Sequence, residues 1–384
     1  MELHTAVSGY ECLTCGASLT ANTDPRECPE CGGPLELAMD LDAIQSDLAG
    51  ADDRSGLSGL LGISTPVDLC QGETPLIDAP GLAREIGVES LAIKDEAQNP
   101  TGSLVDRQAA CAVAAAREAG AGQISLPTTG AAGVAVTMAA ARIDLDTHVF
   151  VPSRASFGHK AMINVHGGDM TVVEGRYSDA AAAYDEHDTE AYPLAPFATP
   201  FRRAGVTPIA IEIAAARDWT APDAVVIPAG QVCSIVGIHR GFTALDALDM
   251  IDGYPRIIAA QAASCAPLTD DGSSSADRPH AIEHPDTVVG ALEVPDPAGG
   301  TVAIDVLRES GGTAIAIPDE AILEAALTLA ERGLPTSATG GAGLAALQSD
   351  SGVVEEGADV VLVNPIAGAS EADILRSHLM RRPR

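Results

Sequence analysis

Four cysteines near the N-terminus are spaced as two Cys-X-X-Cys pairs, Cys12 with Cys15 and Cys28 with Cys31. Each pair can turn two thiolates toward one point, so the two pairs together supply the four sulfur ligands of a tetrahedral zinc site. Four protein ligands leave no open coordination position, so this zinc would be structural. The pattern therefore predicts a zinc ribbon over residues 1–35. The alternative is two disulfides, which cytosolic proteins seldom contain.

A second segment with chemically informative residues, 99–107, reads Asn-Pro-Thr-Gly-Ser-Leu-Val-Asp-Arg. It resembles the lysine loop of fold-type II pyridoxal-phosphate (PLP) enzymes, above all threonine synthase, in which this loop reads Asn-Pro-Thr-Gly-Ser-Phe-Lys-Asp-Arg. In that family the lysine forms a Schiff base with the cofactor and later moves protons on the substrate. Val105 stands at the lysine position, and valine offers neither a nucleophile nor a titratable group.

The resemblance to threonine synthase covers nearly all of the chain after the ribbon. Residues 72–76 (Gly-Glu-Thr-Pro-Leu) are similar to the family's opening Gly-x-Thr-Pro-Leu, and residues 335–338 (Pro-Thr-Ser-Ala) to its late Pro-x-Ser-Ala. Archaeal-type threonine synthases also carry a similar ribbon ahead of the enzyme body. The resemblance implies an α/β fold of the fold-type II class, with two open parallel or mixed sheet domains flanked by helices, and it implies a homodimer.

The resemblance also divides the chain into parts. After the ribbon we expect a linker at 36–70 and a PLP-enzyme-like α/β body at 71–384. Within the body, a small subdomain is expected at roughly 103–200, and the large subdomain is formed by the rest. The body is expected to have a hydrophobic core that is independent of the ribbon.

A second pocket loop departs from the family's pattern. The family reads Ser/Thr-x-Gly-Asn there, and its asparagine hydrogen-bonds the ring oxygen of PLP. Ala131 stands at the asparagine position and cannot donate this bond. The helix that starts here still offers an N-terminus that favours a carboxylate. The positions that match the substrate side of the family's pocket are Ser103, Thr128, Thr129 and Gly130.

The turn that would hold the cofactor phosphate is the third departure. The family has a Gly-rich loop such as Gly-Asn-x-Gly, whose bare amides wrap the phosphate; the matching positions are Gly230, Gln231, Val232, Cys233 and Ser234. Val232 and Cys233 put side chains where glycines would allow close approach. Gly230 and Ser234 could still bind a smaller anion, and the alternative is an ordinary strand-to-helix turn. Cys233 is also a candidate reactive thiol, because helix starts lower thiol pKa values.

Two further features bear on the cofactor. Asn364 follows an expected strand where the family often has Thr-Gly, with the threonine on the PLP ring nitrogen, and Asn364 could reach the same point. Lys94 and Lys160 are the only lysines in the chain, and the family carries non-catalytic lysines near both positions. A Schiff base moved to Lys94 is the alternative to a lost one. Arginine cannot replace lysine, because it stays protonated.

The joint loss of the Schiff-base lysine, the ring-oxygen partner and the phosphate glycines supports a first hypothesis. It is a threonine synthase-like pseudoenzyme with a binding, regulatory or scaffold role, structural zinc, and a small anionic or amino-acid-like ligand in place of PLP. The second hypothesis is an active PLP enzyme that converts O-phosphohomoserine to threonine or handles a related amino acid, through Lys94 or non-covalent PLP. A third is different chemistry at Cys233 or a histidine.

The elements that must position these residues are expected to alternate after Gln71. Short β-branched runs and Ala-rich stretches alternate there, which is typical of parallel sheets covered on both faces, with ligands at the carboxyl ends of the strands. Strands are expected at Gln123–Leu126, His148–Pro152, Met170–Val173, Ala224–Pro228, Arg256–Ala260, Thr313–Ile317 and Val360–Val363. Helices are expected at Ser103–Glu118, Gly133–Ala141, Phe157–Val165, Ile235–Asp249, Glu320–Glu331 and Glu371–Met380. Residues 269–300, rich in Asp, Ser and Pro, are expected to form an exposed excursion.

The composition is strongly acidic, with 54 Asp and Glu against 22 Lys and Arg and a net charge of −32. A dense carboxylate surface keeps a protein soluble in concentrated salt, so we expect a cytoplasmic protein of an extreme halophile. The alternative explanation of the acidity is a basic partner. Nucleic-acid binding is disfavoured, since phosphate contacts need clustered Lys and Arg. No signal peptide is expected, and no apolar run reaches the ~18 residues that a membrane helix needs.

Overall fold

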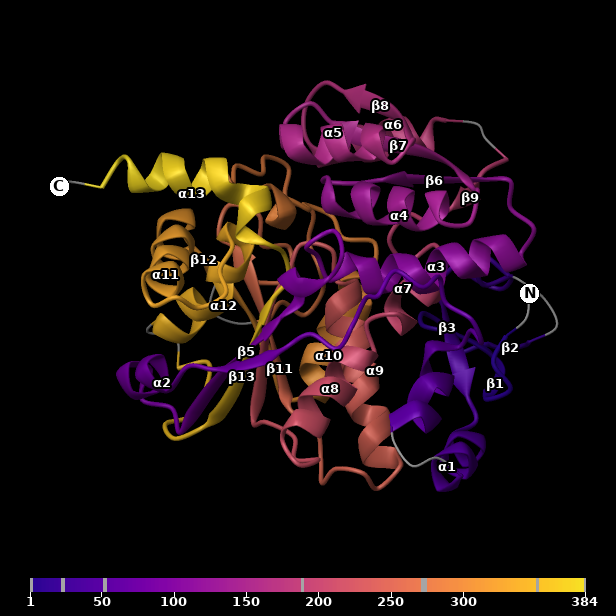
Figure 1. The fold of residues 1–384 in the computed structure, drawn as a ribbon, viewed down its shortest axis with the longest axis horizontal. Helices are drawn as coiled ribbons and strands as arrows, with labels where there is room; N and C mark the ends of the chain where they lie inside the picture. Colours follow the sequence, from indigo (N-terminus) through magenta and orange to yellow (C-terminus); the bar gives the residue numbers. More distant parts are fainter. Residues whose placement is uncertain are drawn as a thin grey trace.

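Three β-sheets organise the part of the chain that the computed structural model describes, which comprises residues 3–21, 25–50, 54–187, 190–270, 275–349 and 352–382. We call the N-terminal part with the three-stranded sheet the ribbon, the part built on the six-stranded sheet the large subdomain, and the part built on the four-stranded sheet the small subdomain. In Figure 1 the small subdomain lies at the top, the large subdomain at the left and centre, and the ribbon at the right.

The six-stranded sheet has the order β12-β11-β10-β13-β5-β4, and all of its strands are parallel except β4. Neighbouring residues of β10 alternate between two cores: Val225 packs with helices α8 to α10, whereas Val226 packs with α11 and α12. Strands that are covered on both faces read as continuous apolar runs, and β10 is buried at every residue. The strand bounds are β4 (Leu76–Asp78), β5 (Ser90–Asp95), β10 (Ala224–Pro228), β11 (Arg256–Ala262), β12 (Thr313–Ile317) and β13 (Asp359–Asn364).

The four-stranded sheet of the small subdomain has the order β8-β7-β6-β9, with every pair parallel. Helices α4, α5 and α6 connect and cover its strands. Its strand bounds are β6 (Gln123–Pro127), β7 (Asp146–Pro152), β8 (Asp169–Val173) and β9 (Tyr192–Pro193).

Every strand and helix expected in the body is confirmed, with ends that agree within two residues. No helix in the described ranges is both long and apolar enough to cross a membrane. The helix bounds in the body are α2 (Pro80–Ile86), α3 (Val105–Glu118), α4 (Ala131–Ala141), α5 (Phe157–Val165), α6 (Tyr177–Asp185), α7 (Phe201–Ala204), α8 (Pro208–Ala216), α9 (Cys233–Ala247), α10 (Gly300–Glu309), α11 (Asp319–Glu331), α12 (Ala338–Gln348) and α13 (Ala372–Leu379).

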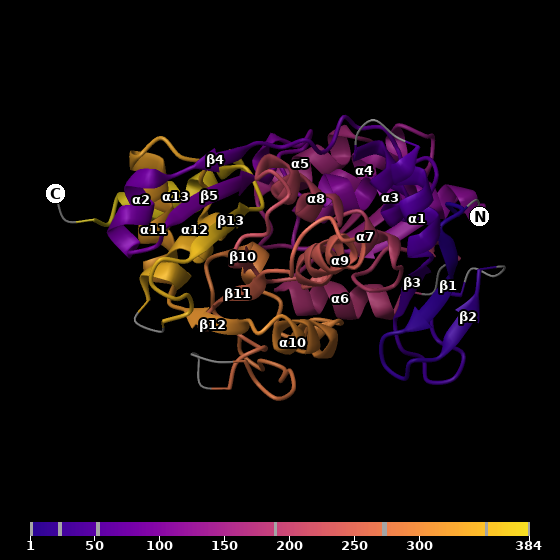
Figure 2. The same cartoon turned by 90° about the horizontal axis from the view of Figure 1, so that it is seen from below.

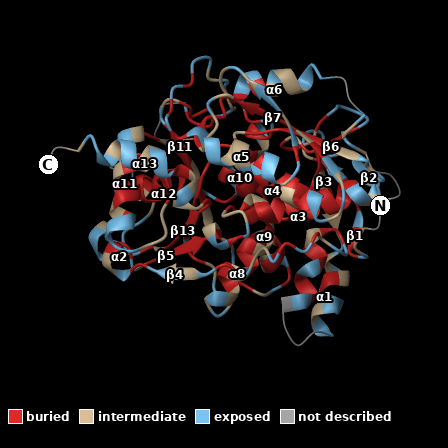
Figure 3. Cartoon of the chain, turned by 45° about the horizontal axis from the view of Figure 1, so that its top comes forward, coloured by how far each residue is buried: buried red, intermediate tan, exposed pale blue. Residues whose placement is uncertain are grey.

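Helix α3 begins at Val105 and is buried on all sides. Every residue from Asp106 to Ala116 is buried, and Figure 3 shows this helix in the buried interior of the molecule. Its many alanines allow α4 and α7 to pack closely against it. A helix that is buried all round serves as core rather than as surface, so the first turn of α3 has a fixed position between the two subdomains.

The ribbon shares its hydrophobic core with the body. The ribbon sheet consists of β1 (Val7–Cys12), β2 (Ser18–Thr20) and β3 (Leu35–Met39), and it is followed by α1 (Leu41–Ala49) and the 3₁₀ helix η1 (Arg54–Leu61). Tyr10 and Leu37 belong to the same core cluster as Ala112 of α3 and Phe201 of α7. The expectation of an independent body core is therefore wrong. Figure 2 shows the ribbon sheet at one end of the molecule and α11 and α12 at the other.

The expected excursion at 269–300 is not exposed throughout, although residues 271–274 lie outside the described part. Val289 and Leu292 have 0% and 1% of their surfaces exposed. The short 3₁₀ helix η3 (Gly290–Leu292) packs against Gly230, where an added Cβ would lie 2.1 Å from the Ala291 carbonyl oxygen. The apolar residues within this Pro-rich run are buried against the body and cover the turn after β10.

Candidate functional site

A central pocket of about 100 Å³ lies between the two subdomains. Its wall is formed by the start of α3, the loop after β6 and the turn after β10. This is the carboxyl edge of the parallel strands, where such sheets bind ligands. The structure brings eight of the expected site residues together around this pocket: Ser103, Val105, Thr128, Thr129, Ala131, Gly230, Gln231 and Ser234.

Two residues of the phosphate-side turn do not line the central pocket. Val232 and Cys233 belong to the hydrophobic core of the large subdomain, with 0% and 1% of their surfaces exposed. The turn therefore presents Gly230, Gln231 and Ser234 to the pocket and directs its two apolar residues into the core. A buried thiol in this position has no solvent path for reaction with a soluble reagent.

Two other expected residues also lie outside the pocket wall. Gly130 has a positive φ of 141° and faces His159, whose Nδ1 would lie 2.4 Å from an added Cβ. Asn364 is buried at the end of β13, where its Oδ1 accepts a hydrogen bond from Ser337 (2.9 Å) and its Nδ2 donates to Asp95 (2.8 Å). The side chain of Asn364 thus ties β13 to its neighbours.

The segment around Val105 is held firmly in place. The Val105 amide donates to Ser103 Oγ (3.3 Å), and Asp106 accepts hydrogen bonds from the amide (2.7 Å) and the hydroxyl (2.6 Å) of Thr101. Burial raises the pKa of Asp106 to about 6, although the hydrogen bonds from Thr101 oppose this shift. The loop geometry is therefore built around a valine whose side chain forms part of the pocket wall.

A network of buried charges lies beneath this segment. Arg107 donates to Glu96 (2.7 Å from Nε) and to both oxygens of Glu212 (2.7 Å each), and Lys94 donates to Glu212 and to the Thr74 carbonyl. Burial by itself would raise the pKa of Glu212, but Arg107 and Lys94 outweigh it and lower the pKa to about 2. Two cations and two carboxylates thus compensate one another inside the protein.

Neither lysine lies at the central pocket. Lys94 is 1% exposed and belongs to the charge network just described, and burial lowers its pKa although Glu212 opposes this. The ammonium group of Lys160 donates to the Ser153 carbonyl (2.7 Å). Neither residue contributes to the pocket wall.

Arg202 is a pocket residue that sequence reasoning missed. It lines the central pocket with 3% of its surface exposed. Its Nε and Nη2 donate to Gln108 Oε1 (3.2 and 3.0 Å) and its Nη1 to the Leu194 carbonyl (2.8 Å). These acceptors are neutral, and no carboxylate within the described ranges forms an ion pair with Arg202.

A sequence signal for this residue does exist. Arg202 and Arg203 are the only charged residues between Glu190 and Glu212. Two arginines in an otherwise uncharged stretch of a very acidic chain indicate buried cations with specific partners, because Arg is almost never fully buried without one.

A wider outer pocket of about 280 Å³ adjoins the central one and shares four lining residues with it: Thr129, Ala131, Ala291 and Ile366. Arg176, just before α6, forms ion pairs with Glu293 (2.6 Å) and Asp286 (3.1 Å), and Arg154 lies 4.0 Å from Glu293. Burial raises the pKa of Glu293, although the two arginines oppose the shift. These ion pairs connect the small subdomain to the large one at the wall of the outer pocket.

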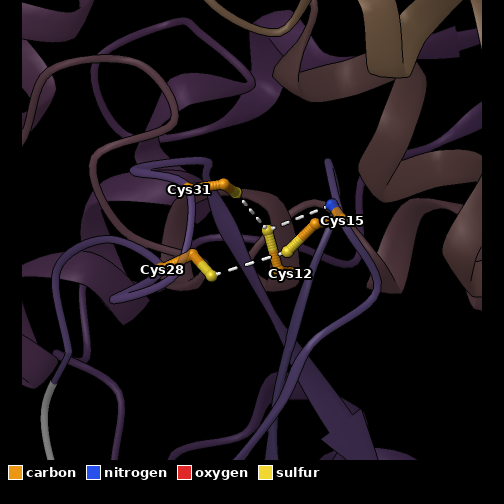
Figure 4. A group of neighbouring side chains, drawn as sticks. All are labelled: Cys12, Cys15, Cys28 and Cys31. Carbon is orange, nitrogen blue, oxygen red and sulfur yellow. Dashed lines mark hydrogen bonds between the residues drawn. The ribbon is translucent and has the colours of Figure 1, made fainter.

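The four N-terminal cysteines converge in the ribbon, as Figure 4 shows. Their sulfur atoms all lie within 4.8 Å of one another, with Cys12 to Cys31 at 3.5 Å and Cys15 to Cys28 at 3.7 Å. Four zinc–sulfur bonds of ~2.3 Å in a tetrahedron put the sulfurs ~3.8 Å apart, so this cluster could hold a zinc ion. A disulfide would need an S–S separation of ~2.05 Å, and all described cysteines are free thiols.

Comparison with known proteins agrees with the fold. Residues 67–365 match the family model described as "Pyridoxal-phosphate dependent enzyme", and residues 4–37 match a domain of unknown function. The threonine synthase of Methanosarcina acetivorans is 31% identical over 92% of this chain and 90% of its own length. The threonine synthase of Synechocystis is 32% identical over 80% of each chain.

Solved structures give the same fold. A fungal L-serine ammonia-lyase from Rhizomucor miehei aligns with a TM-score of 0.68 at 18% identity, covering 81% of this chain and 98% of its own. Threonine deaminase isoform 2 from Solanum lycopersicum aligns with a TM-score of 0.67 at 17% identity, covering 88% of each chain. The family match, the relatives and the pocket at the strand ends agree: the chain belongs to the pyridoxal-phosphate dependent enzyme family.

Proposed function

We propose that this chain is a threonine synthase-like protein that has lost PLP catalysis and now binds a small anion in its central pocket. The observation that carries the proposal is the pocket wall itself. Val105 stands in that wall where the family's Schiff-base lysine is expected, and both lysines of the chain have partners elsewhere. Without a lysine amine at the pocket, the family's covalent attachment of the cofactor has no nucleophile.

PLP does not fit the residues that are present. The central pocket is about 100 Å³ and the adjoining outer pocket about 280 Å³, and pockets for cofactor-sized ligands are typically ~300–1,000 Å³. The Ala131 side chain has no hydrogen-bond donor for a ring oxygen, and the Ala291 backbone lies close to Gly230 in the turn that matches the family's phosphate loop. The central pocket is therefore small by itself, and it lacks the side chains that the resemblance implies for holding the cofactor.

The remaining pocket groups suit a small anion. Arg202 offers a buried guanidinium whose partners are neutral, and an unpaired buried charge is costly until a counter-ion meets it. Ser103, Thr129 and Ser234 add hydroxyl groups to the wall. Hydrogen bonds that involve a charged partner are roughly twice as strong as neutral ones. The group recognised would be a phosphate, a sulfate or a short carboxylate.

The loss of PLP catalysis is tested with the cofactor. Purified protein in molar KCl is mixed with PLP, reduced with borohydride and mapped by mass spectrometry. We expect no adduct at either lysine, because Lys94 is buried in an ion-pair network and Lys160 lies outside the pocket. Reducible PLP at Lys94 together with turnover of O-phosphohomoserine would mean that the protein is an active enzyme.

Anion binding is tested with inorganic phosphate by calorimetry. Arg202→Gln should weaken phosphate binding by at least about tenfold, because hydrogen bonds to a charged group contribute ~1.5–3 kcal/mol. The matched control is Arg308→Gln, which removes an exposed arginine paired with Asp305 on α10. Equal phosphate affinity in wild type and Arg202→Gln would refute the anion site.

A further inference from the structure

In addition to the shared core, one carboxylate links the ribbon to two helices of the body. Glu36 of β3 accepts hydrogen bonds from Arg203 of α7 (2.8 Å) and Arg240 of α9 (2.7 Å). Arg203 has 0% of its side chain exposed. Burial alone would raise the pKa of Glu36, but the two arginines outweigh it and lower the pKa. A buried carboxylate shared by two cations is a contact whose loss leaves both cations uncompensated.

Arg203 is also tied to the ribbon backbone. Its Nη2 donates to the carbonyl of Leu35, and Leu35 pairs with the zinc-site residue Cys12 in the β1–β3 register. On its other side the guanidinium of Arg203 stacks over the ring of Phe197, 4.5 Å from the centroid. One residue of α7 therefore contacts strand β3, which pairs with the strand β1 that ends at the metal ligand Cys12.

The neighbouring residue on α7 faces the central pocket. Arg202 and Arg203 are consecutive in a helix of four residues, so a displacement of Arg203 moves the backbone that carries Arg202. Arg202 reaches the pocket beside Gln108 of α3. Phe201, also on α7, packs in the core cluster that contains Cys12 and Cys28. Densely packed interiors transmit such displacements rather than absorbing them.

We infer that zinc at the four cysteines and an anion at Arg202 bind cooperatively, with Glu36 and Arg203 acting as positioning residues between the two sites. This inference rests on the proposed anion pocket. Ordering of the ribbon sheet by zinc fixes Leu35 and Glu36, which fix Arg203 and thereby α7. Linkage of this kind is reciprocal, so the anion must tighten zinc binding by the same factor by which zinc tightens anion binding.

The cooperativity gives the ribbon a regulatory role. Cys15 and Cys31 are exposed, whereas Cys12 and Cys28 are buried. Competing chelators and thiol-reactive agents can therefore approach the zinc site from one side without entering the body. Depletion of zinc would lower the affinity for an anion of the central pocket, which Arg202 of α7 lines.

The test uses the full chain with its zinc and inorganic phosphate as the probe, at constant molar KCl. Zinc affinity is measured by equilibrium competition with a chromogenic chelator, with and without saturating phosphate. We expect phosphate to tighten zinc binding by at least about fivefold, the lower end of typical coupling between sites. In Arg202→Gln the phosphate effect should vanish, which separates binding at the pocket from any direct effect of phosphate on free zinc.

A second variant addresses the connection itself. Glu36→Gln should bind zinc and phosphate with the coupling reduced toward onefold, whereas Arg308→Gln should keep the wild-type coupling. If Glu36→Gln does not fold, the zinc affinity of the wild-type protein with and without phosphate still tests the cooperativity.

The outcomes separate the two proposals. Phosphate binding that leaves zinc affinity unchanged overturns the cooperativity and leaves the anion pocket standing. A wild-type protein that binds no phosphate overturns the pocket and, with it, the cooperativity. A phosphate effect that persists in Arg202→Gln, or purified protein that contains disulfides instead of zinc, also overturns the inference.

Discussion

At position 105 a valine stands where the resemblance implies a Schiff-base lysine, while the backbone around it keeps its hydrogen bonds. Ser103 and Asp106 still form the hydrogen bonds that fix the loop. Val105→Lys should therefore fold and form a small amount of borohydride-reducible PLP adduct. It should not regain threonine synthase activity, because Ala131 leaves the cofactor ring oxygen without a donor and the pocket remains small, so the aldehyde is badly oriented.

Adduct formation is measured by mass spectrometry of the reduced protein, and activity by the release of phosphate from O-phosphohomoserine. Adding Ala131→Asn and a Gly-rich replacement at 231–233 should raise cofactor affinity stepwise. A single Val105→Lys variant with substantial activity would mean that the other departures are neutral and that only one residue separates this chain from a working enzyme.

The buried charge network supports a prediction about stability. Glu212→Gln should lower the free energy of unfolding by about 3–5 kcal/mol, because it leaves Lys94 and Arg107 buried with too little negative charge. The pKa of Glu212 is lowered to about 2. Its contribution is therefore complete above the ordinary carboxyl pKa of ~4.3 and is lost as the pH falls toward 2.

Denaturant unfolding in molar KCl over this pH range measures both effects. The wild-type protein should lose more stability than Glu212→Gln between these two pH values. The control is Glu331→Gln, which removes an exposed carboxylate paired with Arg382 and should change stability by less than about 1 kcal/mol. Equal stability of Glu212→Gln and wild type would contradict the network's role.

At the scale of elements, the sequence predicted the body well because its signals are local. Strands such as Ala224–Pro228 are short apolar runs followed by turn residues, and helices such as Phe157–Val165 have their cap in the sequence: Ser156 accepts a hydrogen bond from the His159 amide. The family resemblance then placed Val105, Thr128 and the turn near Gly230 in one pocket. The structure brings these three segments together at the strand ends.

The features that the sequence did not predict depend on contacts between distant segments. Arg202 is a pocket residue only because Gln108, far away in the sequence, orients its guanidinium. The Pro-rich run near Leu292 has a loop-like composition, yet its few apolar residues pack against Gly230. Likewise, the cysteine spacing and the strand-helix alternation mark the ribbon and the body as separate units. They therefore do not predict the core that Tyr10 and Phe201 share.

That joint core changes what zinc removal should do. Chelation should lower the stability of the ribbon and of α3 and α7 together, because Cys12 and Cys28 share a core with both helices and zinc binding contributes to folding. Hydrogen exchange followed by mass spectrometry should show faster exchange in α3 and α7 as well as in β1 and β3. The helices α11 and α12, which pack in a different core, serve as the internal control. Faster exchange confined to the ribbon would contradict this prediction.

At the scale of the whole molecule, the oligomeric state and the cellular location remain predictions. The resemblance implies a homodimer, and light scattering in molar KCl tests it by measuring the molar mass of the protein in solution. A cytoplasmic, halophilic origin is an expectation from composition. The acidity itself is a physical property of the chain, and it bears on stability in any compartment.

The net charge of −32 supports a prediction about salt. Like charges at this density repel one another in the folded state, and the repulsion is poorly screened when the Debye length is ~30 Å at 0.01 M salt, compared with ~3 Å at 1 M. The melting temperature should therefore rise steadily with KCl. A control titration near the sequence pI of about 4.4 should show a smaller rise, because protonated carboxyl groups have little charge left to screen. A melting temperature that stays flat from low to molar KCl at neutral pH would refute salt adaptation, since the carboxylates would then be balanced within the fold rather than by the solvent.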